Sequence, residues 1–432
     1  MTAIGFAGST LVFVVSFALT FVILAYRSRF LPSVRRGVDR IQRWATGRAD
    51  WSWLKLWHIM VPLAAVTVAN IIWNAAGAHC SDDSFAILAS GTAALHGHDP
   101  FLVAYCSHSY ATSIPYGLAE VTLDAFGALA GSIVGIWLVW QLFALAVVPL
   151  VWKIAGEDRR YLSVLAATSV LYLPNITTNL GVENNAVAVS VLLMLYALQL
   201  PGRRGIIAQG VAAFFSTARF PAVFPLLGSS ASKGRQRAVS IVIVIGVFLS
   251  AAALSWGLWG WDAIQVVYLG QFARANSESL NLFAVLIHEG WFQPSLSAAA
   301  VQGAGLLLLV LFVHLRGYSP RVACAVPLVG VMILSQYLNY HFLVWLIPLV
   351  LLGASVNWWL LLFATVAAVN ENVLYWYLAL DQGVYWPYEL TSVVLFVILL
   401  VLLITIIRTE ETRLRSERGE DRVEPSDHPT AP

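Results

Sequence analysis

Apolar segments long enough to cross a lipid bilayer recur along this chain, and they constrain its fold more than any other feature. A span needs about 20 apolar residues, or fewer where a broken helix is buried in protein. Only 11% of the 432 residues are charged, whereas soluble domains carry about 25%. Long apolar runs lie near 4–26, 56–75, 130–152, 238–257, 296–315 and 388–408, and shorter ones near 161–174, 185–201, 205–228, 322–338, 341–354 and 356–372. We therefore expect an all-α, polytopic membrane helical bundle of about 11–13 spans, some of them short and broken.

The positions of Lys and Arg predict which loops face the cytoplasm, because cytoplasmic loops retain basic residues. The segment 27–55 is the richest, and placing it inside puts the first long loop, 76–129, outside. Every further cluster then falls inside, provided that 205–228 is an in-and-out hairpin of two half-helices. These clusters are Lys153/Arg159/Arg160, Arg203/Arg204, Lys233/Arg235/Arg237, Arg316/Arg321 and the C-terminal tail. Of the 25 basic residues, this topology leaves only Arg219 and Arg274 off the cytoplasmic side. Acidic residues, by contrast, gather on or near the outer face.

The same pattern divides the chain into three parts. Residues 1–55 form an N-terminal span and a basic cytoplasmic loop, 56–407 form the transmembrane unit, and 408–432 form a polar tail that we expect to be disordered. Cys80 and Cys106 both fall in the outer loop, where an oxidising compartment permits a disulfide. Two unpaired thiols are the alternative.

The outer loop opens with a predicted helix that runs from about Ser81 to His96 and ends at Gly97. One face of this helix is apolar enough to lie along the membrane surface; it consists of Phe85, Leu88, Thr92 and Leu95. Asp82 and Asp83 stand at its start, where the helix dipole favours an ionised carboxylate. Simple capping of the helix is the alternative role.

An Asp at the membrane edge, Asp83, is followed by a helix of small residues and then by a Gly-x-Asp-Pro-aromatic motif, which consists of Gly97, Asp99, Pro100 and Phe101. This arrangement resembles the opening motif of glycosyltransferase family 87, whose members have the GT-C membrane fold. Later stretches match in the same order, through Gly181 and Asn184, Arg219 and Pro221, Asn276 to Asn281, and His341. Val182 stands where the family has Gln, and Ile114-Pro115-Tyr116 stands where it has Tyr-Pro-Pro. The resemblance covers about residues 56–355.

The resemblance implies an inverting enzyme that takes a sugar from a polyprenyl-phosphate donor. The sugar would be mannose and the acceptor a glycolipid or lipid-linked glycan, on the outer face of the cytoplasmic membrane. Asp83 would be the general base, or Asp82 if the register shifts by one residue. An arabinofuranosyltransferase of the same fold is the nearest variant.

Donor binding would fall to cationic and polar groups, because negative charge builds on the departing phosphate. Arg219 suits this role, since a guanidinium forks to two oxygens and stays charged; a structural salt bridge is the alternative. His341 would assist as donor or cation, although an interfacial histidine is the simpler reading of its position. Asn184, Arg274 and Tyr340 are further candidates for the donor phosphate or sugar; a surface role for Arg274 and an interface anchor for Tyr340 remain open.

Other classes of function receive less support from the sequence. No His/Cys/Asp cluster has metal-ligand spacing and no Gly-rich loop could hold a nucleotide, so we expect no metal, no cofactor and no nucleic-acid partner. The expected partners are the lipid donor, the acceptor and membrane lipid; the oligomeric state stays open. The rival from another class is a secondary transporter or lipid flippase, which would bury ionisable groups near mid-bilayer within inverted repeats.

Overall fold

The computed structural model describes residues 53–77, 83–103, 112–113, 117–175, 185–230, 234–269, 282–335, 338, 340–380 and 386–418, together with 32 and 36. These residues are almost entirely helical, which confirms the all-α prediction. The sheet within them is a pair of two-residue antiparallel strands, β1 (Leu102–Val103) and β2 (Thr112–Ser113). The predicted N-terminal span, Cys80, Cys106, Asp82, Asn184 and Arg274 all lie outside the described residues.

Four helices in the described part of the chain are long and apolar enough to cross a membrane. They are α6 (Ile133–Ala155), α11 (Arg235–Ile264) with its π-helical continuation η5 (Gln265–Leu269), α14 (Leu296–Arg316) and α17 (Trp386–Arg418). Each coincides with one of the long apolar runs of the sequence.

Further apolar helices, most of them shorter, occupy the other runs that lie within the described residues. They are α3 (Leu56–Gly77), α7 (Tyr161–Asn175), α8 (Asn185–Ala197), α9 (Gly202–Ser216), α10 (Val223–Ser229), α15 (Pro320–Leu334), the 3-10 helix η6 (Tyr340–Leu351) and α16 (Ala354–Leu380). α8, α15 and the described part of η6 are almost wholly buried, and their side chains form the centre of the main hydrophobic core. Such short helices need neighbours on all sides, because a bilayer cannot satisfy the backbone groups at their ends.

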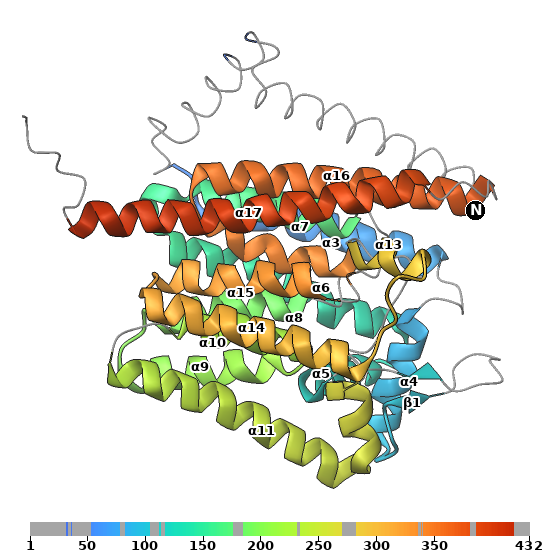
Figure 1. Cartoon of the computed structure of the whole chain (residues 1–432). Coiled ribbons are helices and arrows are strands. Elements are labelled where there is room, and N and C mark those ends of the chain that lie inside the picture. Colours follow the sequence, from blue (N-terminus) through green and yellow to red (C-terminus); the bar gives the residue numbers. More distant parts are fainter. Residues whose placement is uncertain are drawn as a thin grey trace, which may run out of the picture.

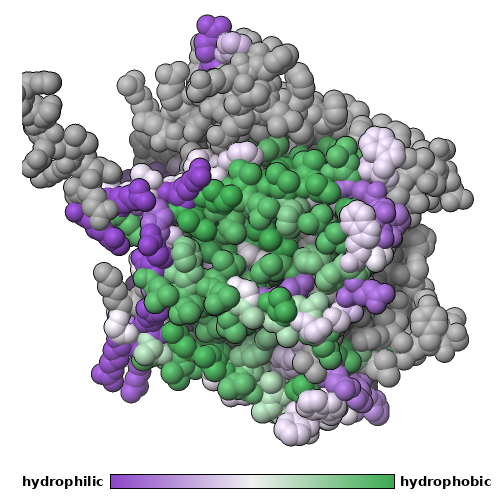
Figure 2. Space-filling model, in the orientation of Figure 1, coloured by the Kyte–Doolittle hydropathy of each residue, from purple (hydrophilic) through white to green (hydrophobic). Residues whose placement is uncertain are grey.

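The helices run roughly along one axis, so that the molecule has two ends (Figure 1). Apolar side chains cover the middle of the surface in Figure 2, and polar side chains gather toward the two ends. Hydrogen bonds between segment termini bring several basic clusters to one end: Arg160 Nη1 donates to Leu54 O (3.2 Å), and Arg321 Nη2 to Ile154 O (3.0 Å). We call this the basic end and the opposite one the outer end. The layout is that of a protein with an apolar belt.

The segment 205–228 is broken in the middle, as the hairpin prediction requires. α9 stops at Ser216, a turn and the 3-10 helix η4 (Phe220–Ala222) follow, and α10 then returns. His314, in the last turn of α14, contacts Leu227 O near the end of α10 at 2.9 Å. α10 therefore ends beside the end of α14, where Arg316 lies, and the break lies deeper in the bundle.

The outer end is built from the segments between α3 and α6. α4 (Asp83–Leu95) and α5 (Leu118–Ala128) lie there beside β1, together with α13 (Leu282–His288) from a later connection (Figure 1). The predicted outer-face helix is thus present as α4. Of the face expected to lie on a membrane surface, Thr92 and Leu95 are exposed, and Ile87 and Ser90 on the other side are buried.

The C-terminal tail differs from the expectation. Disorder was expected from Arg408 onward, but α17 continues as a helix to Arg418. Its extension is held by Arg413, which pairs with Glu410 and Glu417 within the helix, and by bonds from Glu410 and Glu411 to the segment between α14 and α15. The composition of this segment predicted solvated charges. Their spacing of three and four residues, however, lets them pair along one face of a helix.

Candidate functional site

The first structural element of the site is α4 with the turn that ends it. Gly97 adopts a left-handed φ of 74°, which a residue with a side chain rarely adopts. Asp99 Oδ1 then accepts a hydrogen bond from Phe101 N (2.8 Å). The Phe101 ring is fully buried and packs edge-on against Trp259 at 5.4 Å. The Gly-x-Asp-Pro-aromatic motif therefore has a structural role, which is to fold the chain back after α4 and fix α4 against the bundle.

Close backbone contacts fix α5 between α4 and the α9–α10 break. A Cβ added at Gly91 would lie 2.3 Å from Asp124 O, and one added at Gly117 would lie 1.5 Å from Thr217 O. Gly117 N donates to Ala218 O (3.0 Å), and Ala119 N donates to Thr217 Oγ1 (3.2 Å). The start of α5 and the turn before Arg219 are thus joined by one main-chain hydrogen bond and one bond to the Thr217 hydroxyl.

This junction brings a carboxylate and a guanidinium together inside the protein. Arg219 Nε lies 3.4 Å from Glu120 Oε2, and the two side chains are 8% and 0% exposed. Neither oxygen of Glu120 accepts a hydrogen bond from a described residue. Arg219 Cζ also lies over the Phe342 ring, 5.7 Å from its centre, in cation–π geometry. A buried ion pair is stabilising only when its remaining polar atoms are satisfied, and on the Glu120 side they are not.

The electrostatics of the pair follow from that burial. α5 is not among the helices long or apolar enough to cross a membrane. Burial raises the pKa of the Glu120 carboxyl from 4.5 to about 8, although the neighbouring Arg219 charge acts in the opposite direction. Near neutral pH the carboxyl therefore holds a proton, and the positive charge of Arg219 is not cancelled by it. One turn later on α5, Asp124 Oδ1 accepts a hydrogen bond from the buried Trp140 Nε1 (3.2 Å).

Four described segments that are far apart in the sequence meet near this pair. A small buried cluster lies beside it, formed by Ile87, Ala119, Ile136, Trp140, Ala186 and Ala218. Ile87 stands one helical turn after Asp83, Ala186 follows Asn184 by two residues, and Ala218 directly precedes Arg219. Phe342, which packs against Arg219, directly follows His341. Four segments separated by up to about 250 residues therefore meet at one place.

The sequence predictions for this site have mixed outcomes. Arg219 lies beside the start of α5, and its contact with Glu120 matches the structural salt bridge that the sequence allowed as the alternative role. Asp83 begins α4 and Tyr340 and His341 begin η6, but their side chains lie outside the described residues. Asp82, Asn184 and Arg274 lie outside them altogether, as do both cysteines of the predicted disulfide; Cys324, within α15, is a buried free thiol.

Sequence reasoning did not assign roles to Glu120, Asp124 or Phe342. A signal for the two acids was present: they stand four residues apart in a helix that is otherwise mostly apolar, which places them on one face. An apolar helix with two acids on one face needs cationic or hydrogen-bonding partners, and Arg219 was the one buried candidate.

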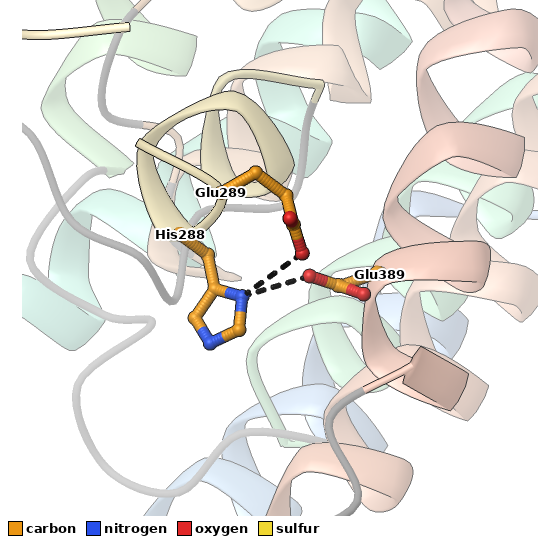
Figure 3. Close-up of side chains that lie close together, drawn as sticks. All are labelled: His288, Glu289 and Glu389. Carbon is orange, nitrogen blue, oxygen red and sulfur yellow. Dashed lines mark hydrogen bonds and ion pairs between the residues drawn. The ribbon is translucent and has the colours of Figure 1, made fainter. Parts of the chain in front are cut away.

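A second group of polar side chains joins α13 to the start of α17 (Figure 3). His288 Nδ1 lies 2.9 Å from Glu389 Oε1 and 3.7 Å from Glu289 Oε1. Within the described part of the chain, these are the residues whose types and proximity could hold a metal ion. Both carboxylates point at the same ring nitrogen, however, and all three side chains are at least partly exposed, so the arrangement is also that of a surface ion pair.

Comparison of the chain with protein-family models, curated proteins and solved structures gave no match.

Proposed function

We propose that this chain is a membrane glycosyltransferase of the GT-C type. It transfers a sugar, with mannose as the first candidate and arabinofuranose as the second, from a polyprenyl-phosphate donor to a glycolipid or lipid-linked glycan. The reaction takes place at the extracytoplasmic face of the cytoplasmic membrane. The proposal rests on the family resemblance of the sequence and on the geometry of the outer end.

One observation supports the proposal most strongly. Ile87 of α4, Ala186 of α8 and Ala218, which precedes Arg219, share one buried cluster, and Phe342, the neighbour of His341, lies against Arg219. Motifs that matched by chance would have no reason to converge. A shared substrate would give them one.

In the proposed reaction Asp83 is the general base, and the acceptor hydroxyl is the nucleophile. Its carboxylate takes the proton of the acceptor hydroxyl while that oxygen bonds to the anomeric carbon, and the bond from that carbon to the phosphate oxygen breaks on the opposite face. The products are the glycosylated acceptor, the polyprenyl phosphate and protonated Asp83. Asp83 is well placed at the first residue of α4, where the helix dipole keeps a carboxylate ionised.

Arg219 stabilises the negative charge that builds on the leaving phosphate. Glu120 contacts Arg219 through Nε and thereby orients the guanidinium. Because Glu120 is neutral below about pH 8, its carboxyl does not compete electrostatically with a lipid phosphate for the Arg219 guanidinium. His341, one residue before Phe342, would contact the same phosphate.

The test is sugar transfer by Asp83→Asn in membranes that contain a polyprenyl-phosphate mannose. We expect the rate to fall by about 10²- to 10⁴-fold, which is the usual contribution of a general base. Asp262→Asn is the matched control, since Asp262 is an exposed acid near the outer end of α11. Equal rates for Asp83→Asn and the wild type, with both folded, would refute the proposal. A parallel assay with a polyprenyl-phosphate arabinofuranose distinguishes the two sugars.

A proton-coupled transporter is the second candidate, because a buried carboxyl with a raised pKa is also the chemistry of a proton relay. It predicts that proteoliposomes acidify or alkalinise on addition of the transported solute, and that Asp83→Asn leaves this flux intact. The glycosyltransferase predicts no such flux and a complete dependence of transfer on Asp83.

A further inference from the structure

A hollow lies at the basic end, away from the site around Arg219. It has a volume of about 600 Å³ and is formed by the ends of α6, α8, η6 and α17 and by the starts of α15 and α16. Its walls are mainly aliphatic, with Ile154, Leu195, Val322, Leu351, Val356 and Ile406 among them. Its polar lining comes from arginine, hydroxyl and amide side chains and from Glu410. The hollow therefore combines an apolar wall with a charged rim.

The one carboxylate in the lining is already neutralised. Glu410 receives two hydrogen bonds from Arg413, with Nε at 2.9 Å and Nη2 at 2.7 Å, and a third from Ser319 N at 2.8 Å. Its function is to hold the end of α17 to the start of α15. Glu410 thus offers little repulsion to an incoming anion.

Two arginines in the lining carry charge that no described carboxylate balances. Arg321, at the second residue of α15, donates from Nη2 to Ile154 O, and Arg159, at the end of η2 (Glu157–Arg159), lies near enough to act on it electrostatically. Neither arginine makes an ion pair with a residue in the described part of the chain. Like charges held side by side favour a bound anion between them.

We propose that this hollow binds the phosphate of an anionic phospholipid from the cytoplasmic leaflet. The two arginines contact the phosphate, and the aliphatic wall receives the adjoining glycerol and acyl carbons. Two observations favour a lipid over a soluble anion: the wall is apolar, and the hollow lies at the basic end of the helices, which the positions of Lys and Arg mark as the cytoplasmic one. Basic pockets between helices on the cytoplasmic side are where such headgroups bind. This inference does not depend on the proposed glycosyltransferase activity.

The test uses the full chain in detergent, titrated with short-chain phosphatidylglycerol, with phosphatidylcholine as the uncharged comparison. We expect the double variant Arg159→Gln/Arg321→Gln to bind phosphatidylglycerol about 30-fold more weakly than the wild type. The matched control is Arg203→Gln/Arg204→Gln, which removes two exposed charges from the same end but outside the hollow. An equal loss in both double variants would mean general surface attraction and would overturn the proposal.

Two further measurements keep the outcome decisive. Inorganic phosphate at the same concentration should not compete with phosphatidylglycerol; full competition would make the hollow a site for a free anion and refute the lipid. If the double variant does not fold, Thr409→Glu adds a negative charge at an exposed position in the lining. Unchanged affinity in Thr409→Glu would also overturn the proposal.

Discussion

The two ends of the molecule treat charge in opposite ways. At the basic end, Glu411 accepts hydrogen bonds from two nitrogens of Arg316 and from Tyr318 Oη, which lies 2.6 Å away. At the outer end, Glu120 has one ion-pair contact at 3.4 Å with Arg219 and accepts no hydrogen bond from a described residue. The first carboxylate is partly exposed and well satisfied, and the second is buried and poorly satisfied.

The difference indicates what each set of charges is for. A satisfied network at the surface holds helix ends in place and costs little if it is lost. A buried and incompletely paired group costs free energy, and proteins retain such groups mainly where a ligand or a proton completes them. On this basis we propose a functional role for Arg219 and a structural role for Arg316.

The largest expected effect contrasts these two arginines directly. Arg219→Gln should lower sugar transfer by about 10²- to 10³-fold, because the leaving phosphate loses its cation. Arg316→Gln should leave transfer within about twofold of the wild type, since exposed pairs contribute at most about 1 kcal/mol to stability. Rates are measured per folded protein in membranes. The comparison fails if both variants lose transfer equally.

A stability measurement then asks whether the outer end is rigid. Gly117→Ala should lower the free energy of unfolding by about 3 kcal/mol, because the new Cβ would overlap Thr217 O and force main chain apart. Gly210→Ala is the control, as a Cβ at that position meets nothing within 4 Å. Thermal unfolding in detergent gives both values. Equal midpoints for the two variants would mean that the α5 junction yields easily.

The pH dependence of donor binding sharpens the role of Glu120. The folded-state pKa of about 8 lies above the ordinary 4.5, so the carboxyl is neutral below pH 8 and becomes charged above it. Once charged, it competes with the phosphate for Arg219, and the donor KM should rise about tenfold between pH 7 and pH 9. Glu120→Gln mimics the neutral form and should give a flat profile. A wild-type profile that is equally flat would remove Glu120 from the donor site.

A smaller effect is expected in the basic-end network. Glu411→Gln removes the partner of Arg316 and Tyr318, and the last turns of α17 should fray while transfer stays unchanged. The expected loss of stability is about 1 kcal/mol or less. Faster tryptic cleavage at Arg415 measures the fraying, with Glu417→Gln as the control at an exposed pair. Slower or unchanged cleavage would mean that other contacts hold the end of α17 in place.

The smallest effect concerns the group at α13 and α17. Glu389→Gln should change the unfolding midpoint only slightly, because His288 and Glu289 are both exposed. Titration with Mn²⁺ or Zn²⁺ provides the further readout. If either ion raises the midpoint of the wild type and not that of Glu389→Gln, the group is a metal site rather than a surface ion pair.

Much of the architecture follows from the sequence because one physical quantity, the transfer of apolar side chains out of water, dominates it. The long runs near 130–152, 238–257, 296–315 and 388–408 became α6, α11, α14 and α17. The break within 205–228 was predicted from a second quantity, the number of spans needed to keep all basic loops on one side. The helical extension to Arg418 was not anticipated, because composition cannot show which charges will pair along a helix.

The site was less accessible to sequence reasoning. Arg219 stood out because a cation within an apolar segment is costly and rare. Glu120 did not, since its role depends on Gly117 approaching Thr217 across about 100 residues of chain. Phe342 likewise looked like one more apolar side chain until η6 placed it over the guanidinium. Such roles arise from packing between distant segments, which local patterns do not encode.

The main-chain junction between Gly117 and Thr217 has a mechanical consequence. Because two hydrogen bonds and a close backbone approach join α5 to the turn before Arg219, we expect these two segments to move together when a substrate binds. We expect this half of the site to be rigid. Any closure around a substrate must come from the opposite wall, where η6 presents Phe342.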